Sequence, residues 1–185
     1  ALDVFRRKGY TATRLVDIAK EGGVTRGAIY WHFNDKAELF IELNKENRKR
    51  TQEIVEKVWS GDFSPVEKIR QVIIELFTFL EEDDKFRAFQ ELALFKTEML
   101  EELHEEFKCE KDDWNYHVGR LIENIQQGQK EGLFRKDIIP EDMATAFFSY
   151  VYGLMSVWFL ESKSFSIKEK ASIFVDLFLE GQLTN

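Results

Sequence analysis

The stretch from residue 14 to residue 33 reads RLVDIAKEGGVTRGAIYWHF and has the pattern of two short helices joined by a tight turn. Leu15 and Ile18 are spaced as the buried face of the first helix, because residues three apart share one side of a helix. Gly22 and Gly23 follow and permit a sharp turn, since glycine adopts backbone conformations that other residues avoid. The segment therefore predicts a helix, a turn and a second helix.

The second helix is predicted to start after Thr25, whose hydroxyl is a preferred N-cap. Ile29 and Phe33 are four residues apart and would both face inward. The outward face then carries Arg26, Gly27, Ala28, Tyr30, Trp31 and His32. Two short helices at this spacing form a helix-turn-helix, whose second helix enters the major groove of DNA.

The outward face has the chemistry that DNA binding needs. Arg26 can donate two hydrogen bonds to guanine O6 and N7, and the small residues Gly27 and Ala28 let the helix approach the base edges. Tyr30 and His32 can donate to phosphates. The alternative is an ordinary surface helix with exposed aromatics, but two large aromatics flanked by Arg and His favour DNA binding.

Charge divides the chain into two parts. The 185 residues include 26 Lys+Arg and 34 Asp+Glu, a net charge of −8 that by itself argues against nucleic acid. Residues 1–50, however, hold 11 Lys+Arg and 7 Asp+Glu, whereas residues 51–185 hold 15 and 27. A head of net charge +4 on a body of net charge −12 indicates two separate tasks in one chain.

Composition excludes several classes of protein. With 44% apolar and 32% charged residues, the chain is predicted to be globular, and no apolar run approaches the roughly 18–20 residues that span a bilayer. The single cysteine excludes a disulfide framework and fits a reducing, cytoplasmic location. His104, Cys109 and His117 lack the spacing of a zinc site, and the sequence has no phosphate loop or Ser–His–acid set. We therefore expect no metal, no cofactor, no membrane partner and no enzyme.

Helix start signals recur along the rest of the chain. Capping-box patterns begin at Asp35, Ser64 and Ser166, and Pro65 and Pro140 mark helix starts because proline is tolerated at the first helical position. Apolar residues at helical spacing predict the helices themselves. These helices cover residues 36–59, 66–80, 85–95, 98–129, 141–160 and 167–180.

The ends of these helices raise three further expectations. Residues 2–8, followed by Gly9, read as the last turns of a helix, so we expect its start to precede Ala1, the alternative being an uncapped start there. The helix over 98–129 could break near Cys109. The helix over 141–160 is apolar on nearly every side, which predicts packing against a second subunit. The predicted fold is all-α with about nine helices, the first truncated, in two domains: a three-helix DNA-binding domain over 1–45 and a ligand-binding and dimerisation domain over 46–185.

The head resembles the DNA-binding domain of the TetR family of bacterial regulators. The resemblance rests on residues 9–13, residues 17–19 and the segment GVTRGAIYWHFNDKAEL over 23–39. The sequence of that segment is most similar to the AcrR- and TtgR-like branch of the family, whose members repress multidrug efflux pumps. Weaker similarity covers much of the body, at residues 91–99, 132–144 and 150–158. Gly22 departs from the family, which more often has alanine there.

The resemblance implies a homodimer formed by the last two long helices, and a DNA operator released by an apolar ligand. The residues that it implies in DNA contact are Thr13, Thr25, Arg26, Gly27, Ala28, Tyr30, Trp31, His32 and Lys36. Among them, Thr13 would touch phosphate from the N-cap of the first helix of the motif. Arg26 would read bases, and Tyr30 and His32 would clamp phosphates.

The body is where a small molecule would bind, because bundle interiors hold apolar pockets with a few fixed polar groups. The pocket candidates are Val72, Leu76, Gln90, Leu94, Tyr116, His117, Phe148 and Tyr152. Plain core packing is the alternative for each of these side chains. Glu91 and Glu98 could pair with a cationic ligand if buried, although surface exposure is the expectation.

The sequence thus predicts a ligand-responsive repressor that binds a near-palindromic operator as a dimer. Its effector would be a small apolar or amphipathic molecule, and its target an efflux pump. Two alternatives stay open: a small-molecule binding protein with a non-functional DNA-binding head, and a regulator of lipid or stress metabolism.

Overall fold

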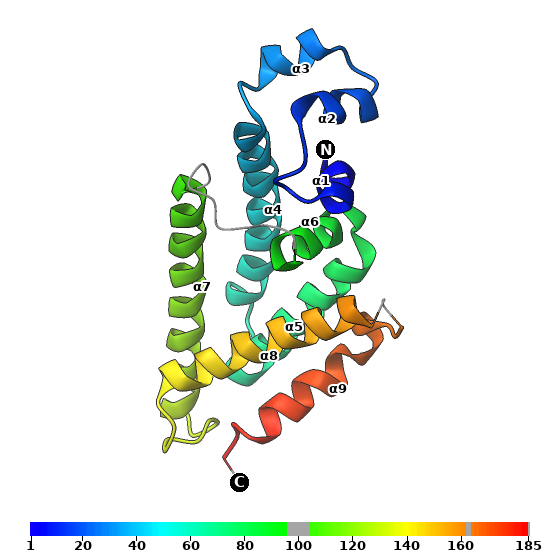
Figure 1. The fold of residues 1–185 in the computed structure, drawn as a ribbon. Helices are drawn as coiled ribbons and strands as arrows, with labels where there is room; N and C mark the ends of the chain where they lie inside the picture. Colours follow the sequence, from blue (N-terminus) through cyan, green and yellow to red (C-terminus); the bar gives the residue numbers. More distant parts are fainter. Residues whose placement is uncertain (96–103, 162–163, 185) are drawn as a thin grey trace. The chain divides into compact units, whose positions relative to one another are not determined.

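The computed structural model describes residues 1–95, 104–161 and 164–184, and over these residues the chain forms nine helices (Figure 1). They are α1 (Leu2–Lys8), α2 (Leu15–Glu21), α3 (Arg26–His32), α4 (Lys36–Trp59), α5 (Pro65–Glu82), α6 (Asp84–Phe95), α7 (His104–Lys130), α8 (Pro140–Leu160) and α9 (Ile167–Glu180). Apart from an isolated bridge between Phe134 and Leu183, the described residues contain no β-structure. The all-α prediction is confirmed.

The predicted helix starts are confirmed by their caps. The hydroxyl of Ser64 accepts a hydrogen bond from the amide three residues later at 3.3 Å, as do the hydroxyl of Ser166 at 3.0 Å and the carboxylate of Asp35 at 2.9 Å. Pro65 and Pro140 are the first residues of α5 and α8. The connecting helix α4 has the bounds predicted from sequence, because residues 36–59 contain neither glycine nor proline.

Helix α7 runs without interruption through Cys109, so the alternative of a break there is wrong. The predicted start of this helix at residue 98 lies outside the described residues. Gly9 follows α1 with φ of 78°, as expected for a glycine that ends a helix.

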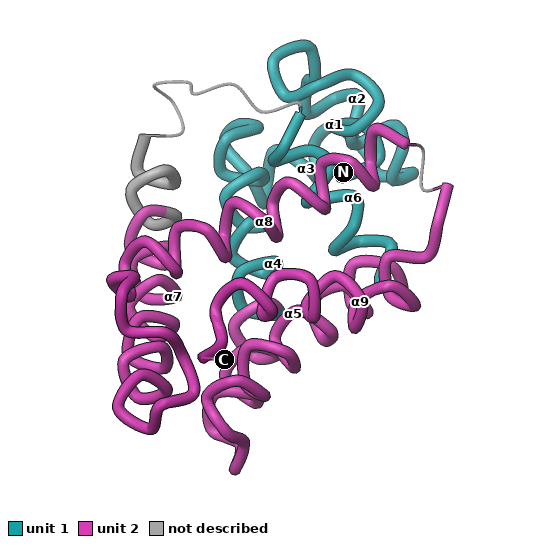
Figure 2. Tube along the Cα trace, turned by 90° about the horizontal axis from the view of Figure 1, so that it is seen from below, with its two compact units in different colours: residues 1–50, 83–110 teal, residues 51–82, 111–185 magenta. Residues whose placement is uncertain are grey.

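The chain divides into two compact units (Figure 2). Unit 1 contains residues 1–50 and 83–110, and unit 2 contains residues 51–82 and 111–185. The contacts therefore group α6 with the N-terminal helices. The domain boundary predicted between residues 45 and 46 stays a prediction.

Unit 1 is built on a cluster of aromatic rings. The ring of Phe40 lies edge-on to Phe5 at 5.7 Å and to Tyr10 at 5.1 Å, and its centroid is 5.9 Å from that of Phe89 on α6. All four side chains are buried. Aromatic rings bury large apolar areas and dominate core energetics. The helix-turn-helix and α6 therefore share one core.

Unit 2 is centred on the pair α5 and α9, which lie side by side. Arg70 of α5 pairs with Asp176 of α9 at 2.5 Å. At the other end of α5, the hydroxyl of Ser166 donates to Glu81 at 3.0 Å. These contacts hold both ends of α9 against α5.

The end of α7 contacts the start of α5 and the segment that follows α7. The Asn124 side-chain amide donates to the carbonyl oxygen of Pro65 at 2.8 Å, and Asn124 is buried. One turn later, a Cβ atom on Gly128 would lie 2.3 Å from the ring of Phe134. Glycine is required there because the Phe134 ring, which is 1% exposed, occupies that space.

Helix α8 buries one face in unit 2 and exposes the other. The buried residues are Met143, Ala144, Phe147, Val151, Met155 and Trp158. On the opposite face Val157 is 50% and Leu160 is 73% exposed, and Ile173 and Leu177 of α9 are 59% and 60% exposed. A single chain thus leaves an apolar surface on these two helices. By length and composition alone, α8 would also be able to cross a membrane, a test that core helices of soluble proteins pass as well.

Candidate DNA-binding surface and effector region

The second helix of the motif is α3, and it starts as predicted. The Thr25 hydroxyl accepts a hydrogen bond from the Ala28 amide at 3.1 Å and caps the helix. Gly23 has φ of 66°, a left-handed conformation that favours glycine, whereas Gly22 is in the right-handed helical region. The turn therefore favours glycine at position 23, whereas other residues can adopt the backbone conformation of position 22, where a Cβ atom would lie 3.3 Å from the Ile18 carbonyl oxygen.

The outward face of α3 is exposed. Ile29 is the only buried residue of this helix, while Tyr30 is 44% and Trp31 is 81% exposed. The Arg26 guanidinium lies over the Tyr30 ring, 5.4 Å from its centroid, and the Trp31 ring lies edge-on to His32 at 4.6 Å. An exposed tryptophan gains nothing from folding, so this face is suited to contact another molecule.

Helix α2 supports α3 from below and is tied to α1 by charge. Lys8 pairs with Asp17 at 3.0 Å, and Arg7 pairs with Glu21 at 3.2 Å. The hydrogen bond from Lys8 holds the pKa of the Asp17 carboxyl below its usual value. Both pairs are partly exposed, so they orient the helices more than they stabilise them.

The structure corrects the placement of Thr13. The N-cap of α2 is Arg14, and Thr13 lies one residue earlier. Its side chain is 1% exposed, and its hydroxyl donates to the carbonyl oxygen of Gly9 at 2.7 Å. The N-cap prediction for Thr13 is therefore wrong, and its phosphate contact stays a prediction that the burial of the hydroxyl disfavours.

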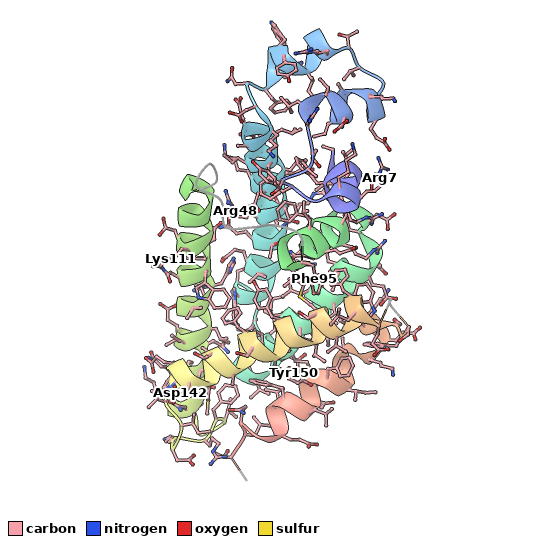
Figure 3. The ribbon with its side chains drawn as sticks, in the orientation of Figure 1. Arg7, Arg48, Phe95, Lys111, Asp142 and Tyr150 are labelled. Atoms are coloured by element: carbon pink, nitrogen blue, oxygen red, sulfur yellow. The ribbon has the colours of Figure 1, made fainter. Side chains whose placement is uncertain are left out.

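Lys36 occupies the first position of α4, as predicted, but its ammonium group has partners within unit 1. It donates to the carbonyl oxygens of Tyr10 and Thr11 at 3.2 Å and 3.1 Å, and lies 4.5 Å from the centroid of the Tyr10 ring. Lys36 therefore connects the loop before α2 to the start of α4. Other cations of unit 1 lie on α1 and α4, among them Arg7 and Arg48 (Figure 3).

The eight predicted effector residues do not all fall in one unit. Gln90 and Leu94 belong to α6 in unit 1, and the other six belong to unit 2. Among those six, Phe148 and Tyr152 of α8 meet Trp114 of α7, with ring centroids 4.5 Å and 6.0 Å apart. Val72 is buried in α5. The predicted pocket as a whole stays a prediction, and Glu98 lies outside the described residues.

Tyr116 and His117 of α7 have polar surroundings. The Tyr116 hydroxyl donates to Glu56 of α4 at 2.5 Å, which raises the pKa of Tyr116. His117 is half-buried, and its burial lowers its pKa, although Asp113 and Glu56 act in the opposite direction. The imidazole is therefore uncharged at neutral pH.

Two polar side chains near these residues were not singled out from sequence. Trp59 ends α4 and is 8% exposed, and Arg120 lies on α7 one turn after Tyr116. Trp59 Nε1 and Arg120 Nε are buried and have no hydrogen-bond partner among the described residues. No sequence pattern reports this, because pairing depends on which atoms tertiary packing brings together.

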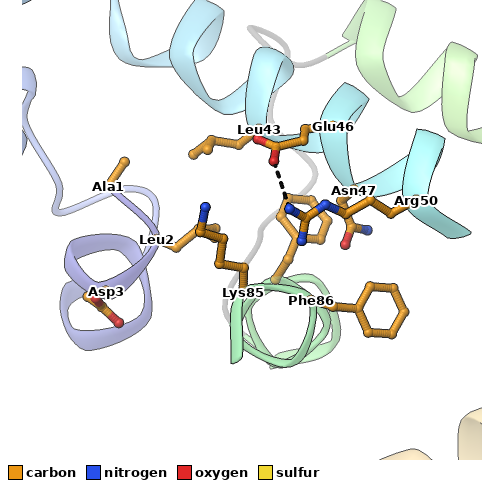
Figure 4. A pocket seen from close by; sticks show the side chains of 10 residues that line it. Ala1, Leu2, Asp3, Leu43, Glu46, Asn47, Arg50, Lys85 and Phe86 are labelled. Atoms are coloured by element: carbon orange, nitrogen blue, oxygen red, sulfur yellow. Dashed lines mark ion pairs between the residues drawn. The ribbon is translucent and has the colours of Figure 1, made fainter. Parts of the chain in front are cut away.

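Unit 1 contains a pocket of about 300 Å³ between α1, α4 and α6 (Figure 4). Phe86 and Phe89 line it from α6, together with Asn47 and Arg50 from α4. Arg50 pairs with Glu46 at 3.2 Å and with Asp83 at 3.1 Å, so its charge is neutralised at the pocket wall. Sequence reasoning did not predict this pocket.

Two sequence families match the chain. Residues 1–43 match the family described as bacterial regulatory proteins, tetR family, and residues 64–183 match the C-terminal region of the MAATS-type transcriptional repressors. Together these matches cover both the helix-turn-helix and most of the remaining helices.

Individual relatives extend over nearly the whole chain. It is 28% identical to the transcriptional regulator AcrR of Shigella flexneri, over 99% of this chain and 86% of that protein. It is 30% identical to TtgR of Pseudomonas putida, over 95% of this chain and 84% of that protein. The crystal structure of NalD, a repressor of the MexAB-OprM efflux pump of Pseudomonas aeruginosa, has the same fold, with a TM-score of 0.82 at 22% identity over 100% of this chain and 92% of NalD.

Proposed function

The chain belongs to the TetR family of bacterial regulatory proteins, and on this basis we propose that it is a ligand-responsive transcriptional repressor. The observation that carries the proposal is the face of α3, whose residues are exposed apart from Ile29 and combine Arg26 with three aromatic or imidazole side chains. The function of a DNA-binding regulator places the protein in the cytoplasm, where the operator is.

The protein binds DNA as a dimer in this proposal. The exposed apolar residues of α8 and α9 form the contact between subunits, because such a surface on a soluble protein marks an interface. Two α3 helices then enter successive major grooves, roughly 34 Å apart, on a near-palindromic operator. Arg26 reads bases, Tyr30 and His32 hold phosphates, and the remaining contacts come from Thr25, Gly27, Ala28 and Trp31.

The effector acts by favouring one of two shapes of the protein. A small molecule that binds better to a form with a different spacing of the two α3 helices lowers operator affinity by that difference in binding free energy. The similarity to NalD, a repressor of a multidrug efflux pump, supports an efflux pump as the controlled system. Control of lipid or stress metabolism is the competing assignment.

Selection of genomic DNA fragments by the purified protein tests the proposal. We expect enrichment of near-palindromic fragments next to transporter genes, and release of those fragments by lipophilic compounds in a gel shift. Enrichment next to lipid-metabolism genes, with release by acyl compounds, would reassign the regulated system. Recovery of random fragments only would mean that the DNA-binding head is non-functional.

A further inference from the structure

Three buried polar atoms of unit 2 have no hydrogen-bond partner among the residues that the structure describes. They are Trp59 Nε1, His117 Nδ1 and Arg120 Nε. Each unpaired buried atom lost its hydrogen bonds to water on folding without gaining a replacement, which destabilises the folded state. Sites that bind ligands by hydrogen bonds tolerate this cost, because the ligand supplies the missing partner.

The three atoms lie on two helices, α4 and α7, that a hydrogen bond joins. The hydrogen bond from Tyr116 to Glu56 joins α7 to the last part of α4 within unit 2. Trp59 lies three residues after Glu56, and Arg120 lies four residues after Tyr116, so each continues the same helix face by one turn. Both helices run in the same direction (Figure 1), so the next turn of each helix beyond the Tyr116–Glu56 hydrogen bond carries Trp59 on α4 and Arg120 on α7.

The donors define what a partner must offer. The indole N–H of Trp59 and the Nε–H of Arg120 can only donate, so a partner must carry hydrogen-bond acceptors. The uncharged imidazole of His117 can add a third donor from Nδ1. A lipophilic cation without acceptors would leave all three groups unpaired.

The charges of the region also disfavour an anion. Glu56 and Asp113 both act on His117, and Arg120 Nη1 lies 3.7 Å from Glu123. Three carboxylates, those of Glu56, Asp113 and Glu123, therefore outnumber the single cation Arg120, which disfavours an anionic ligand. The adjacent rings of Trp114, Phe148 and Tyr152 offer flat apolar surface to an aromatic partner.

Resting on the proposed function, we propose that the effector is an uncharged aromatic molecule with acceptor oxygens, such as a diaryl ketone, and that Trp59 and Arg120 donate hydrogen bonds to those oxygens. The effector class is thereby distinct from lipophilic cations and from free acids. Binding gives the two donors the partners that they lack in the ligand-free protein.

The ligand-free protein provides the first test. Trp158 and Trp59 are both buried, at 2% and 8% exposure, but the indole N–H of Trp158 donates to the carbonyl oxygen of Phe165 at 2.8 Å, so Trp158 serves as the control. We expect Trp158→Phe to lower the Tm more than Trp59→Phe, because only the former loses a hydrogen bond. Likewise Arg70→Met, which breaks two ion pairs, should lower the Tm more than Arg120→Met. Equal losses within each pair would overturn the inference.

The second test uses three probes of similar shape on the protein bound to its selected operator: benzophenone, diphenylmethane and tetraphenylphosphonium. Benzophenone and diphenylmethane differ by the acceptor oxygen alone. We expect benzophenone to release the operator at a roughly tenfold lower concentration than diphenylmethane, the factor that one hydrogen bond contributes. Trp59→Phe and Arg120→Met should each reduce this advantage, while Arg70→Met should keep it.

The outcomes separate the inference from the proposed function. Four results would overturn the inference and leave operator binding intact. Tetraphenylphosphonium could release the operator more strongly than benzophenone, or the two uncharged probes could release it equally. Both variants could keep the advantage of benzophenone, or no probe could release the operator. Failure of the wild-type protein to bind any selected operator would instead overturn the proposed function.

Discussion

The face of α3 and the interior of unit 2 hold their aromatic side chains in opposite ways. On α3, Trp31 is 81% exposed and contributes little to folding. In unit 2, Trp158 is 2% exposed and its indole N–H is hydrogen-bonded. DNA binding and stability therefore depend on different side chains: variants of the α3 face should change DNA binding while the Tm is kept, and variants that disturb the packing of unit 2 should lower the Tm.

The largest expected effect is on the interior side of this comparison. Gly128→Ala would place a Cβ atom 2.3 Å from the Phe134 ring, and overpacking of this kind lowers the free energy of unfolding by about 3 kcal/mol. Gly119→Ala on the same helix meets no atom within 4 Å and should raise it by about 0.5–1 kcal/mol, since alanine is the better helix former. Urea unfolding of both variants measures the difference, and equal values would show that the ring moves freely.

On the α3 side, Arg26→Ala should weaken specific operator binding by about 1–3 kcal/mol and relax the base preference at one position of each half-site. The Tm should stay within the range of ordinary surface substitutions, because Arg26 is exposed. Fluorescence anisotropy at fixed salt, paired with a thermal melt, separates the two effects. Unchanged affinity and base preference would remove Arg26 from the proposed contacts.

Lys36 has two candidate roles, a structural one within unit 1 and a contact with phosphate, and a substitution distinguishes them. If it mainly connects Tyr10 and Thr11 to α4, Lys36→Met should lower the free energy of unfolding by about 1 kcal/mol and leave the salt slope of operator binding unchanged. If it mainly contacts phosphate, the slope should fall by about one unit with the Tm preserved. We expect the first outcome from the geometry.

The smallest expected effect is a dependence of the stability of unit 2 on pH. Burial lowers the pKa of His117 from its usual 6.5, so the folded state binds this proton less readily than the unfolded state. The resulting stability is complete above pH 6.5 and is lost as the pH falls through the lowered pKa. His117→Gln should therefore reduce the decline of the Tm between pH 7 and pH 5. An unaltered decline would show that other groups cause it.

The helices and the exposed face of α3 were largely predictable from sequence because their signals are local. Thr25, Ser64 and Pro140 start helices through atoms within a few residues of themselves. The bounds of α4 follow from the absence of breakers over 36–59. These features need no knowledge of tertiary packing.

The features of these sites that the sequence did not show depend on tertiary packing. Thr13 has the residue type of an N-cap, but its hydroxyl is engaged by the carbonyl of Gly9 when α1 and α2 pack. The Lys36 ammonium group donates to two carbonyl oxygens of the loop that ends at α2, a pairing that the sequence does not show, and its predicted phosphate contact stays a prediction. The unpaired donors of Trp59 and Arg120 could not be predicted either, since each depends on what the neighbouring helix fails to supply.

A titration can compare binding of the dimer to its selected operator and to a scrambled duplex of the same composition, over a series of salt concentrations. We expect the protein to bind the operator at least about 10³-fold more tightly than the scrambled duplex. The logarithm of each affinity should fall linearly with the logarithm of the salt concentration. Equal affinity for the two duplexes at every salt concentration would contradict the first of these expectations.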